Sequence, residues 1–101
     1  MQIINQNISA IKNLCVKYKV KELYAFGSVT NPKKFNDNSD IDLLVEFGAV
    51  NEKDYADNYF QFINSLEALL GREVDLITAK YLRNRFFVQS INETKKMIYL
   101  S

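Results

Sequence analysis

Histidine is absent from this 101-residue chain, and cysteine and proline occur once each. The lack of histidine excludes imidazole acid–base catalysis and histidine-containing zinc sites. The lone Cys15 excludes an internal disulfide and fits a reducing compartment. No apolar run approaches the roughly 18 residues of a membrane-spanning helix, and residues 1–6 lack the basic and apolar regions of a signal peptide. We therefore expect a cytoplasmic protein without membrane association.

The charge of the chain is nearly balanced. Its formal net charge is +1, and 25% of its residues are charged. A protein that binds nucleic acid unaided usually has a clearly basic surface, so the balanced charge does not favour nucleic-acid binding. Hydrophobic residues make up 48% of the sequence, which is enough for one core. We expect a single domain over residues 1–101.

The segment Asp40–Phe47 predicts a strand with one acidic and one apolar face. Asp40 and Asp42 share a face, roughly 6.6 Å apart along the strand. Neighbouring carboxylates repel each other, and a divalent cation such as Mg²⁺ relieves that repulsion with oxygen ligands. The opposite face is suited to a core and carries Ile41, Leu43, Val45 and Phe47.

A second candidate element is the turn Gly27-Ser28, which follows the apolar strand expected at Glu22–Phe26. Glycine allows the backbone to approach a ligand closely. If Ser28 begins a short helix, its N–H groups and hydroxyl point at an anion. The turn is therefore a candidate phosphate site.

A third strand is expected at Glu73–Ile77, where Asp75 shares a face with Ile77. An aspartate in a short buried strand is costly unless it is paired or binds a metal. This cost makes Asp75 the candidate for a third carboxylate.

Three stretches have the apolar spacing of helices. The first covers residues 4–18, and Cys15 lies on its apolar stripe as a core residue. The second begins near Asn51 and ends at Gly71, a C-cap; its leading aromatics belong to the core or stack a base. The third runs over residues 81–91. Its expected inward side chains are Leu82, Phe86 and Ile91.

With a last strand at Met97–Leu100, the order is helix, strand, turn, strand, helix, strand, helix, strand. This order predicts an α/β (α+β) domain with a mixed sheet backed by helices. The short link between the first two strands favours an antiparallel pair, and the long helix allows a right-handed parallel crossover to the third. That topology would place Asp75 beside Asp40 and Asp42, opposite Gly27-Ser28.

Taken together, Gly27-Ser28, the run Ser39–Val45 and the run Glu73–Thr78 resemble the signature of the polymerase-beta-like nucleotidyltransferases. The chain is most similar to the minimal nucleotidyltransferases, small proteins often paired with a HEPN-domain toxin. The resemblance covers nearly the whole chain. One departure is the missing second glycine of the family: residues 29–38 contain none, although a turn can still form around Asn31-Pro32.

The resemblance implies Mg²⁺-dependent transfer of a nucleoside monophosphate, AMP from ATP, to an acceptor hydroxyl with release of pyrophosphate. It implies that Asp40 and Asp42 bind two Mg²⁺ ions. Asp75 would complete this catalytic metal site and could accept the proton of the acceptor. Gly27 and Ser28 would bind the nucleotide through its β- and γ-phosphates.

The resemblance further implies that the acceptor is a tyrosine of a partner HEPN toxin, so that the protein acts as an antitoxin. A chain of this size has no room for a second domain that would hold an acceptor. The alternatives are a non-catalytic antitoxin that occludes its partner and a nucleotide-binding regulator. The intact Asp40, Asp42 and Asp75 favour the enzyme. Two basic pairs, Lys33-Lys34 and Arg83-Arg85, are solvated surface or phosphate contacts.

Overall fold

The computed structural model describes the backbone of residues 1–101 and every side chain except that of Tyr81. The elements follow the predicted order, in which the turn is the 3₁₀ turn η1, except that the first helix is divided into α1 and α2 and a further 3₁₀ turn, η2, follows β3. In chain order they are α1 (Gln2–Gln6), α2 (Ile8–Lys17), β1 (Val20–Phe26), η1 (Gly27–Thr30), β2 (Ile41–Phe47), α3 (Glu52–Leu70), β3 (Val74–Thr78), η2 (Ala79–Tyr81), α4 (Arg85–Thr94) and β4 (Lys96–Leu100).

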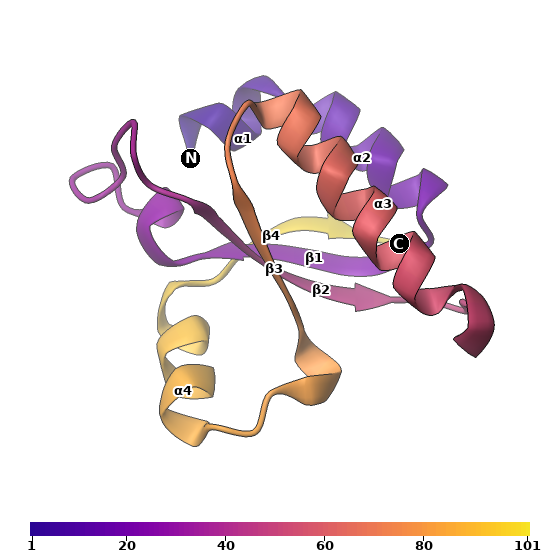
Figure 1. Ribbon diagram of the computed structural model, residues 1–101. Helices are drawn as coiled ribbons and strands as arrows, with labels where there is room; N and C mark the ends of the chain where they lie inside the picture. Colours follow the sequence, from indigo (N-terminus) through magenta and orange to yellow (C-terminus); the bar gives the residue numbers. More distant parts are fainter.

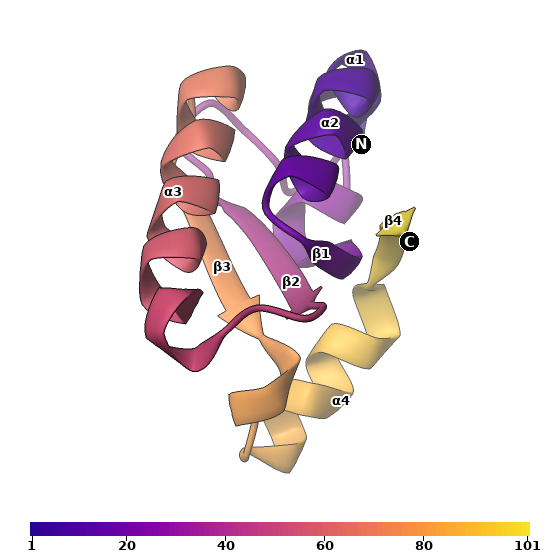
Figure 2. The same ribbon diagram turned by 90° about the vertical axis from the view of Figure 1, so that its right-hand side faces the viewer.

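The strands form a mixed sheet in the order β3-β2-β1-β4. Strand β1 pairs antiparallel with β2 and with β4, whereas β2 and β3 are parallel. Helices α1, α2 and α3 cover one face of the sheet, and α4 lies on the other face (Figures 1 and 2). The predicted α/β fold, the antiparallel first pair and the parallel pairing through the long helix are confirmed.

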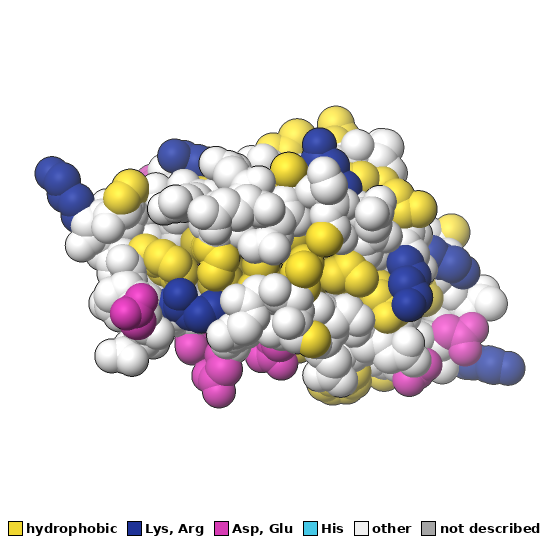
Figure 3. Space-filling model, turned by 90° about the horizontal axis from the view of Figure 1, so that it is seen from above, with side chains coloured by type: hydrophobic (Ala, Val, Ile, Leu, Met, Phe, Trp, Pro, Cys, Tyr) yellow, Lys and Arg dark blue, Asp and Glu magenta, His cyan; other side chains and the backbone are white. Residues whose placement is uncertain are grey.

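The main core lies between the sheet and α1, α2 and α3. The alternation in β2 works as predicted, because Ile41, Leu43 and Val45 are fully buried on this face. They pack with Phe62 and Leu66 of α3 in one continuous cluster, which also contains Cys15. The aromatic stripe of α3 thus contributes Phe62 to the core. Seen from the helix side, hydrophobic side chains run in a strip along the middle of the surface, with charged ones mostly near its margins (Figure 3).

A second, smaller cluster fills the opposite face of the sheet. Leu44, which points away from the main core, packs there with Phe26 and with Ile91 of α4. Phe87 of α4 meets the Phe26 ring edge-on, with ring centroids 6.1 Å apart. Helix α4 is therefore attached to the face of the sheet that carries Asp42.

The helix expected over residues 4–18 is interrupted at Asn7, where α1 ends and α2 begins. The Asn7 side-chain amide donates a hydrogen bond to the Ile3 carbonyl at 2.8 Å. Asparagine side chains compete in this way with the backbone bonds of a helix. The apolar stripe survives the break, since Ile4, Ile11 and Cys15 are buried.

The boundaries predicted for the last helix are wrong at its start. Helix α4 begins at Arg85, because the Asn84 side chain caps it by accepting from the amides of Phe86 and Phe87 at 2.9 and 3.1 Å. Ile91 is 1% exposed as predicted, whereas Phe86, five positions earlier and thus about 140° away around the helix, is 72% exposed. Leu82 precedes the helix and is packed against the smaller cluster.

Helix α3 ends as predicted at Gly71, which has a left-handed φ of 65° and donates its amide to the Glu67 carbonyl at 2.9 Å. Within the part of the chain that the structure describes, no helix has the length and apolar character needed to cross a membrane.

Candidate active site

Adjacent strands place Asp75, Asp42 and Phe26 in one row across the sheet. Asp42 on β2 is the register partner of Asp75 on β3 and of Phe26 on β1. Register partners in a sheet point their side chains to the same face. The structure therefore brings together Asp42 and Asp75, on the face where α4 lies (Figure 2).

The carboxylates of this row interact electrostatically. Burial, and next the charges of Asp75 and Asp40, raise the pKa of the Asp42 carboxyl above its ordinary value of 3.8. An ion pair joins Lys21 to Glu46 at 3.9 Å near the other end of β2, so this pair does not neutralise the three carboxylates.

Asp75 does not lie buried in its strand, so the prediction of a buried aspartate is wrong. Strand β3 lies at the edge of the sheet, and the Asp75 side chain is exposed. No burial cost therefore requires Asp75 to have a partner. Its position beside Asp42 follows from the register of two parallel strands instead.

Asp40 lies one residue before β2 rather than within the strand, and it is exposed. The next amide, that of Ile41, donates to the Glu73 carbonyl at 2.9 Å. This bond begins the β2–β3 pairing. Asp40 therefore immediately precedes the paired strand residues, among which are Asp42 and Asp75.

The glycine turn lies directly against Asp42. Gly27 has a φ of 71°, and a Cβ on this residue would lie 2.7 Å from Asp42 Oδ2. Any side chain here would be strained by the left-handed backbone and would displace the carboxylate. The turn η1 is a 3₁₀ turn that begins at Gly27, one residue earlier than the short helix expected from Ser28.

Thr94, the last residue of α4, holds the glycine turn from the other side. The Gly27 amide donates to Thr94 Oγ1 at 3.1 Å, and the Thr94 hydroxyl donates to the Ser90 carbonyl at 3.3 Å. Within η1, the Thr30 hydroxyl donates to the Gly27 carbonyl at 2.7 Å. Sequence reasoning missed Thr94, because nothing local links a residue near the C-terminus to a turn 67 positions earlier.

The loop between η1 and β2 turns around Asn31-Pro32, as predicted despite the missing glycine. The Asn31 carbonyl accepts the amides of Lys34 and Phe35 at 3.0 Å each. Ser39 Oγ accepts the Asn36 amide at 3.1 Å and so shapes the turn that leads into β2. The side chains of Lys33 and Lys34 are exposed.

A nucleotidyltransferase domain model matches residues 8–100 of the chain. The chain belongs to this nucleotidyltransferase family. The resemblance seen in Gly27-Ser28 and in the aspartate strands is thereby confirmed, and with it the prediction of an enzyme.

Relatives of this nucleotidyltransferase agree with the assignment. A protein of Methanocaldococcus jannaschii named "Putative protein adenylyltransferase" is 42% identical over 77 residues, covering 76% of this chain and 75% of the relative. A solved structure described as a "putative minimal nucleotidyltransferase" has a TM-score of 0.77 at 24% identity, covering 94% of this chain and 92% of its own. A chain from the complex of tri-AMPylated Shewanella oneidensis HEPN toxin with MNT antitoxin has a TM-score of 0.67 at 20% identity, covering 100% and 74%. The two structures share the fold.

The donor atoms of this nucleotidyltransferase suit magnesium in kind. Carboxylate oxygens are the hard ligands that Mg²⁺ takes, with the remaining positions filled by water and substrate phosphate. Within the described part of the chain, no three acidic or cysteine side chains are grouped closely enough to hold an ion between them. The described carboxylates therefore do not complete a metal site by themselves, and a bound ion would need oxygen ligands from outside the protein.

Proposed function

We propose that this nucleotidyltransferase transfers AMP from ATP to a tyrosine hydroxyl of a partner HEPN toxin, and that this modification neutralises the toxin. The observation that carries the proposal is the in-register pair of Asp42 and Asp75 beside the Gly27 turn. The name of the M. jannaschii relative supports protein adenylylation as the reaction. The AMPylated toxin in the Shewanella complex supports the class of acceptor.

The charges around Asp42 support a role for magnesium. Burial, and next the charges of Asp75 and Asp40, raise the pKa of Asp42, and a cation would stabilise these carboxylates in their ionised form. Asp40 and Asp42 would hold two Mg²⁺ ions, with Asp75 completing the set and phosphate oxygens supplying ligands that the protein lacks. When bound, the ions supply Lewis-acid polarisation and charge neutralisation at the reacting phosphate.

Gly27 and Ser28 are proposed to bind the β- and γ-phosphates. The close approach of Gly27 to Asp42 supports this assignment, because the turn lies directly beside a proposed metal ligand. Gly27 has no side chain to obstruct a phosphate, and Ser28 adds a hydroxyl donor. Thr94 keeps the turn in place through the Gly27 amide.

In the reaction the acceptor oxygen attacks the α-phosphorus of ATP. A bond forms between the tyrosine oxygen and this phosphorus, while the bond from the α-phosphorus to the bridging oxygen breaks and pyrophosphate leaves with its electron pair. The hydroxyl proton passes to the Asp75 carboxylate. Because Asp75 is exposed on an edge strand, it can release the proton to water and can be reached by a residue of another protein.

A second candidate function is occlusion of the toxin without transfer. The observation that favours it is that the described acidic side chains form no closed metal group. Such a protein would neutralise its partner by binding alone, and Asp42 would be dispensable for neutralisation.

The deciding experiment incubates the co-purified HEPN partner with Mg²⁺ and ATP labelled on the α-phosphate. The proposal expects label on a partner tyrosine, identified by mass spectrometry, and loss of both label and neutralisation in Asp42→Asn. Circular dichroism checks that the variant is folded. If the wild type and Asp42→Asn both neutralise the toxin and no label appears on the toxin, the protein acts by occlusion. That result would overturn the proposal of AMP transfer.

A further inference from the structure

The loop that leads to Asp40, residues 31–40, is stabilised mostly by its own short-range hydrogen bonds. The amides of Lys34 and Phe35 bond to Asn31, the Asn38 amide donates to Asn36 Oδ1 at 2.8 Å, and the Ser39 amide donates to the Asn36 carbonyl at 3.1 Å. Such bonds shape turns, but they do not fix the loop relative to the sheet. Its position must be set by contacts with distant segments.

Phe35 supplies one of these distant contacts by packing against the main core, and Arg72 supplies the hydrogen bonds. Its guanidinium donates to the carbonyls of Asn36 and Ser39, the latter at 2.6 Å, and it lies over the Phe35 ring at 4.5 Å from the centroid. Among the described residues, these are the hydrogen bonds that join residues 31–40 to a segment more than four positions away. The Ser39 carbonyl belongs to the peptide unit that continues into Asp40, so this contact acts one residue from the carboxylate.

The backbone around Arg72 is itself firmly held. Gly71 ends α3 in the left-handed conformation, which sends the chain back toward the sheet. The next strand is anchored by the Val74 amide, which donates to Glu67 Oε2 at 3.0 Å. Glu73 accepts the Ile41 amide at 2.9 Å. Arg72 therefore bonds to the loop from a segment that is tied to α3 on one side and to β2 on the other.

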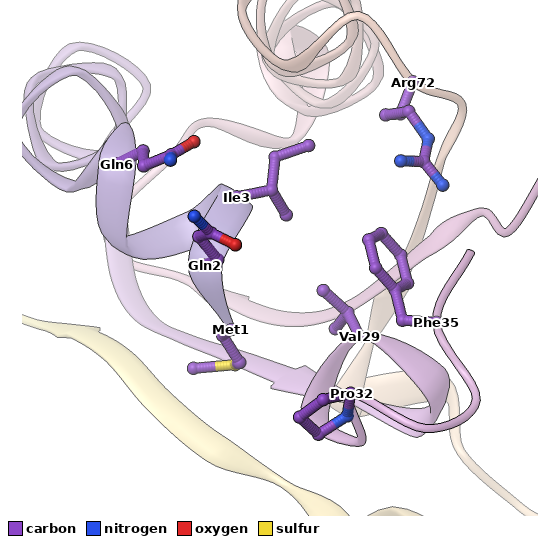
Figure 4. A pocket seen from close by; sticks show the side chains of 8 residues that line it. All are labelled: Met1, Gln2, Ile3, Gln6, Val29, Pro32, Phe35 and Arg72. Atoms are coloured by element: carbon purple, nitrogen blue, oxygen red, sulfur yellow. The ribbon is translucent and has the colours of Figure 1, made fainter. Parts of the chain in front are cut away.

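The loop borders an open pocket on the side where Arg72 and Phe35 lie. A pocket of about 550 Å³ lies between α1 and the loop, and Arg72 and Phe35 form one part of its wall (Figure 4). The side chains of Gln2 and Ile3 line it from the α1 side, at a distance from the loop residues in the same view. Helix α1 thus leaves room for the loop to move, and the Arg72 contacts oppose that movement.

Planar guanidinium is suited to this task, because it can bond to two carbonyls in one plane and stack on a ring with its face. Its partners are backbone oxygens, and no ion pair of Arg72 with Asp40, Asp42 or Asp75 is seen among the described side chains. The cation therefore holds the loop without neutralising the carboxylates by direct pairing.

We propose that Arg72 is a positioning residue of the transferase, which fixes Asp40 at the start of β2 by holding the carbonyls of Asn36 and Ser39. The role of Asp40 rests on the proposed function, whereas the fixing of the loop by Arg72 does not. Arg72 is not proposed to contact the reacting atoms. Its contribution is the geometry of the loop that ends at Asp40.

Two variants test the proposal by removing all or only some of the Arg72 contacts. Arg72→Ala removes all of the contacts, and Arg72→Gln keeps one donor group without the charge or the planar fork. The matched control is Lys17→Ala, which removes another surface cation over an aromatic ring, 5.4 Å from the Tyr18 centroid on α2. Amide hydrogen exchange over residues 31–40 is the first readout, and calorimetric titration of Mg²⁺ with a non-hydrolysable ATP analogue is the second.

The proposal expects the Asn36, Asn38 and Ser39 amides to exchange about tenfold faster or more in Arg72→Ala, as the loss of hydrogen bonds to a charged group implies. Mg²⁺ affinity should fall by a similar factor, with smaller changes of both kinds in Arg72→Gln and none in Lys17→Ala. If Arg72→Ala does not fold, Arg72→Gln decides. Loop exchange at the wild-type rate in a folded variant would overturn the proposal, as would wild-type Mg²⁺ affinity. If the wild type itself binds no Mg²⁺ and transfers no AMP, the proposed function fails, and the exchange result still decides whether Arg72 fixes the loop.

Discussion

Gly27 and Asp42 are in such close contact that the smallest side chain on the glycine would collide with the aspartate. A Cβ on Gly27 would lie 2.7 Å from Asp42 Oδ2, whereas a Cβ on Gly71 would meet nothing within 4 Å. Both glycines have a left-handed φ, 71° and 65° respectively. The two positions therefore differ in crowding and share the same kind of backbone strain.

This difference predicts the outcome of two alanine substitutions. Gly71→Ala should lower the free energy of unfolding by about 1 kcal/mol, the cost of a left-handed alanine. Gly27→Ala should lower it further, because the new methyl group displaces the Asp42 carboxylate. Urea unfolding of both variants measures the difference, and the double variant Gly27→Ala with Asp42→Ala should recover part of it. Equal losses at the two glycines would show that the contact with Asp42 costs nothing.

The raised pKa of Asp42 predicts how stability depends on pH. Because burial and the charges of Asp75 and Asp40 raise this pKa in the folded state, the folded protein binds the proton more tightly than the unfolded chain. That contribution to stability is present below the ordinary pKa of 3.8 and is lost as pH rises through the folded value. Asp42→Asn cannot ionise, so in EDTA its melting temperature should exceed that of the wild type at pH 7, with the gap narrowing as pH falls toward 4.

Asp57→Asn, an exposed aspartate on α3, is the control for the loss of one negative charge. It should show no comparable gap in melting temperature. A constant gap for Asp42→Asn across the same pH range would contradict the assigned cause.

The bond between Thr94 and the Gly27 amide predicts a contrast between two near-isosteric variants. Thr94→Val keeps the shape but leaves the Gly27 N–H without its acceptor, which should lower the free energy of unfolding by about 1–3 kcal/mol. Thr94→Ser retains the hydroxyl and should lose much less. Urea unfolding and titration of ATP report on stability and on the turn. If the serine and valine variants bind ATP equally well, Thr94 does not hold the turn for the nucleotide.

Burial of Cys15 predicts an inert thiol. Its side chain is fully buried, and the loss of hydration raises its pKa to about 12. Since the thiolate is the reactive form, about 10⁻⁴ of the thiol is ionised at pH 8. A maleimide reagent should therefore label the native protein very slowly and the urea-unfolded protein rapidly. Rapid labelling of the native protein would mean that α2 opens far more often than its packing implies.

Several features of the fold could be predicted because they depend on local patterns. The alternation in β2 identified its buried face at Ile41, Leu43 and Val45, and the left-handed preference of glycine identified the end of α3 at Gly71. The short link and the long helix then constrained the pairing of the strands. The neighbourhood of Asp42 and Asp75 followed from that topology.

Other features depend on interactions that the spacing of apolar residues does not reveal, such as side-chain bonds to the backbone and the order of strands in the sheet. The apolar spacing of the last helix placed Phe86 inward, but the packing of Ile91 sets which side of α4 faces the sheet and leaves Phe86 exposed to solvent. Asn7 broke the first helix through a side-chain bond to the backbone. The exposure of Asp75 depends on the order of strands in the sheet, which places β3 at the edge. The contacts of Arg72 and Thr94 span 33 or more positions, so no local pattern announces them.

The bond between Gly27 and Thr94 also bears on when the site is completed during synthesis. The glycine turn and both β2 aspartates are translated early, yet the hydroxyl that accepts the Gly27 amide is made 67 residues later, followed by the strand that pairs with the outer edge of β1. A nascent chain that still lacks α4 and β4 would contain the carboxylates but not the hydrogen bond between the Gly27 amide and Thr94. The glycine turn therefore reaches its final form only once residue 94 has left the ribosome and packed against it.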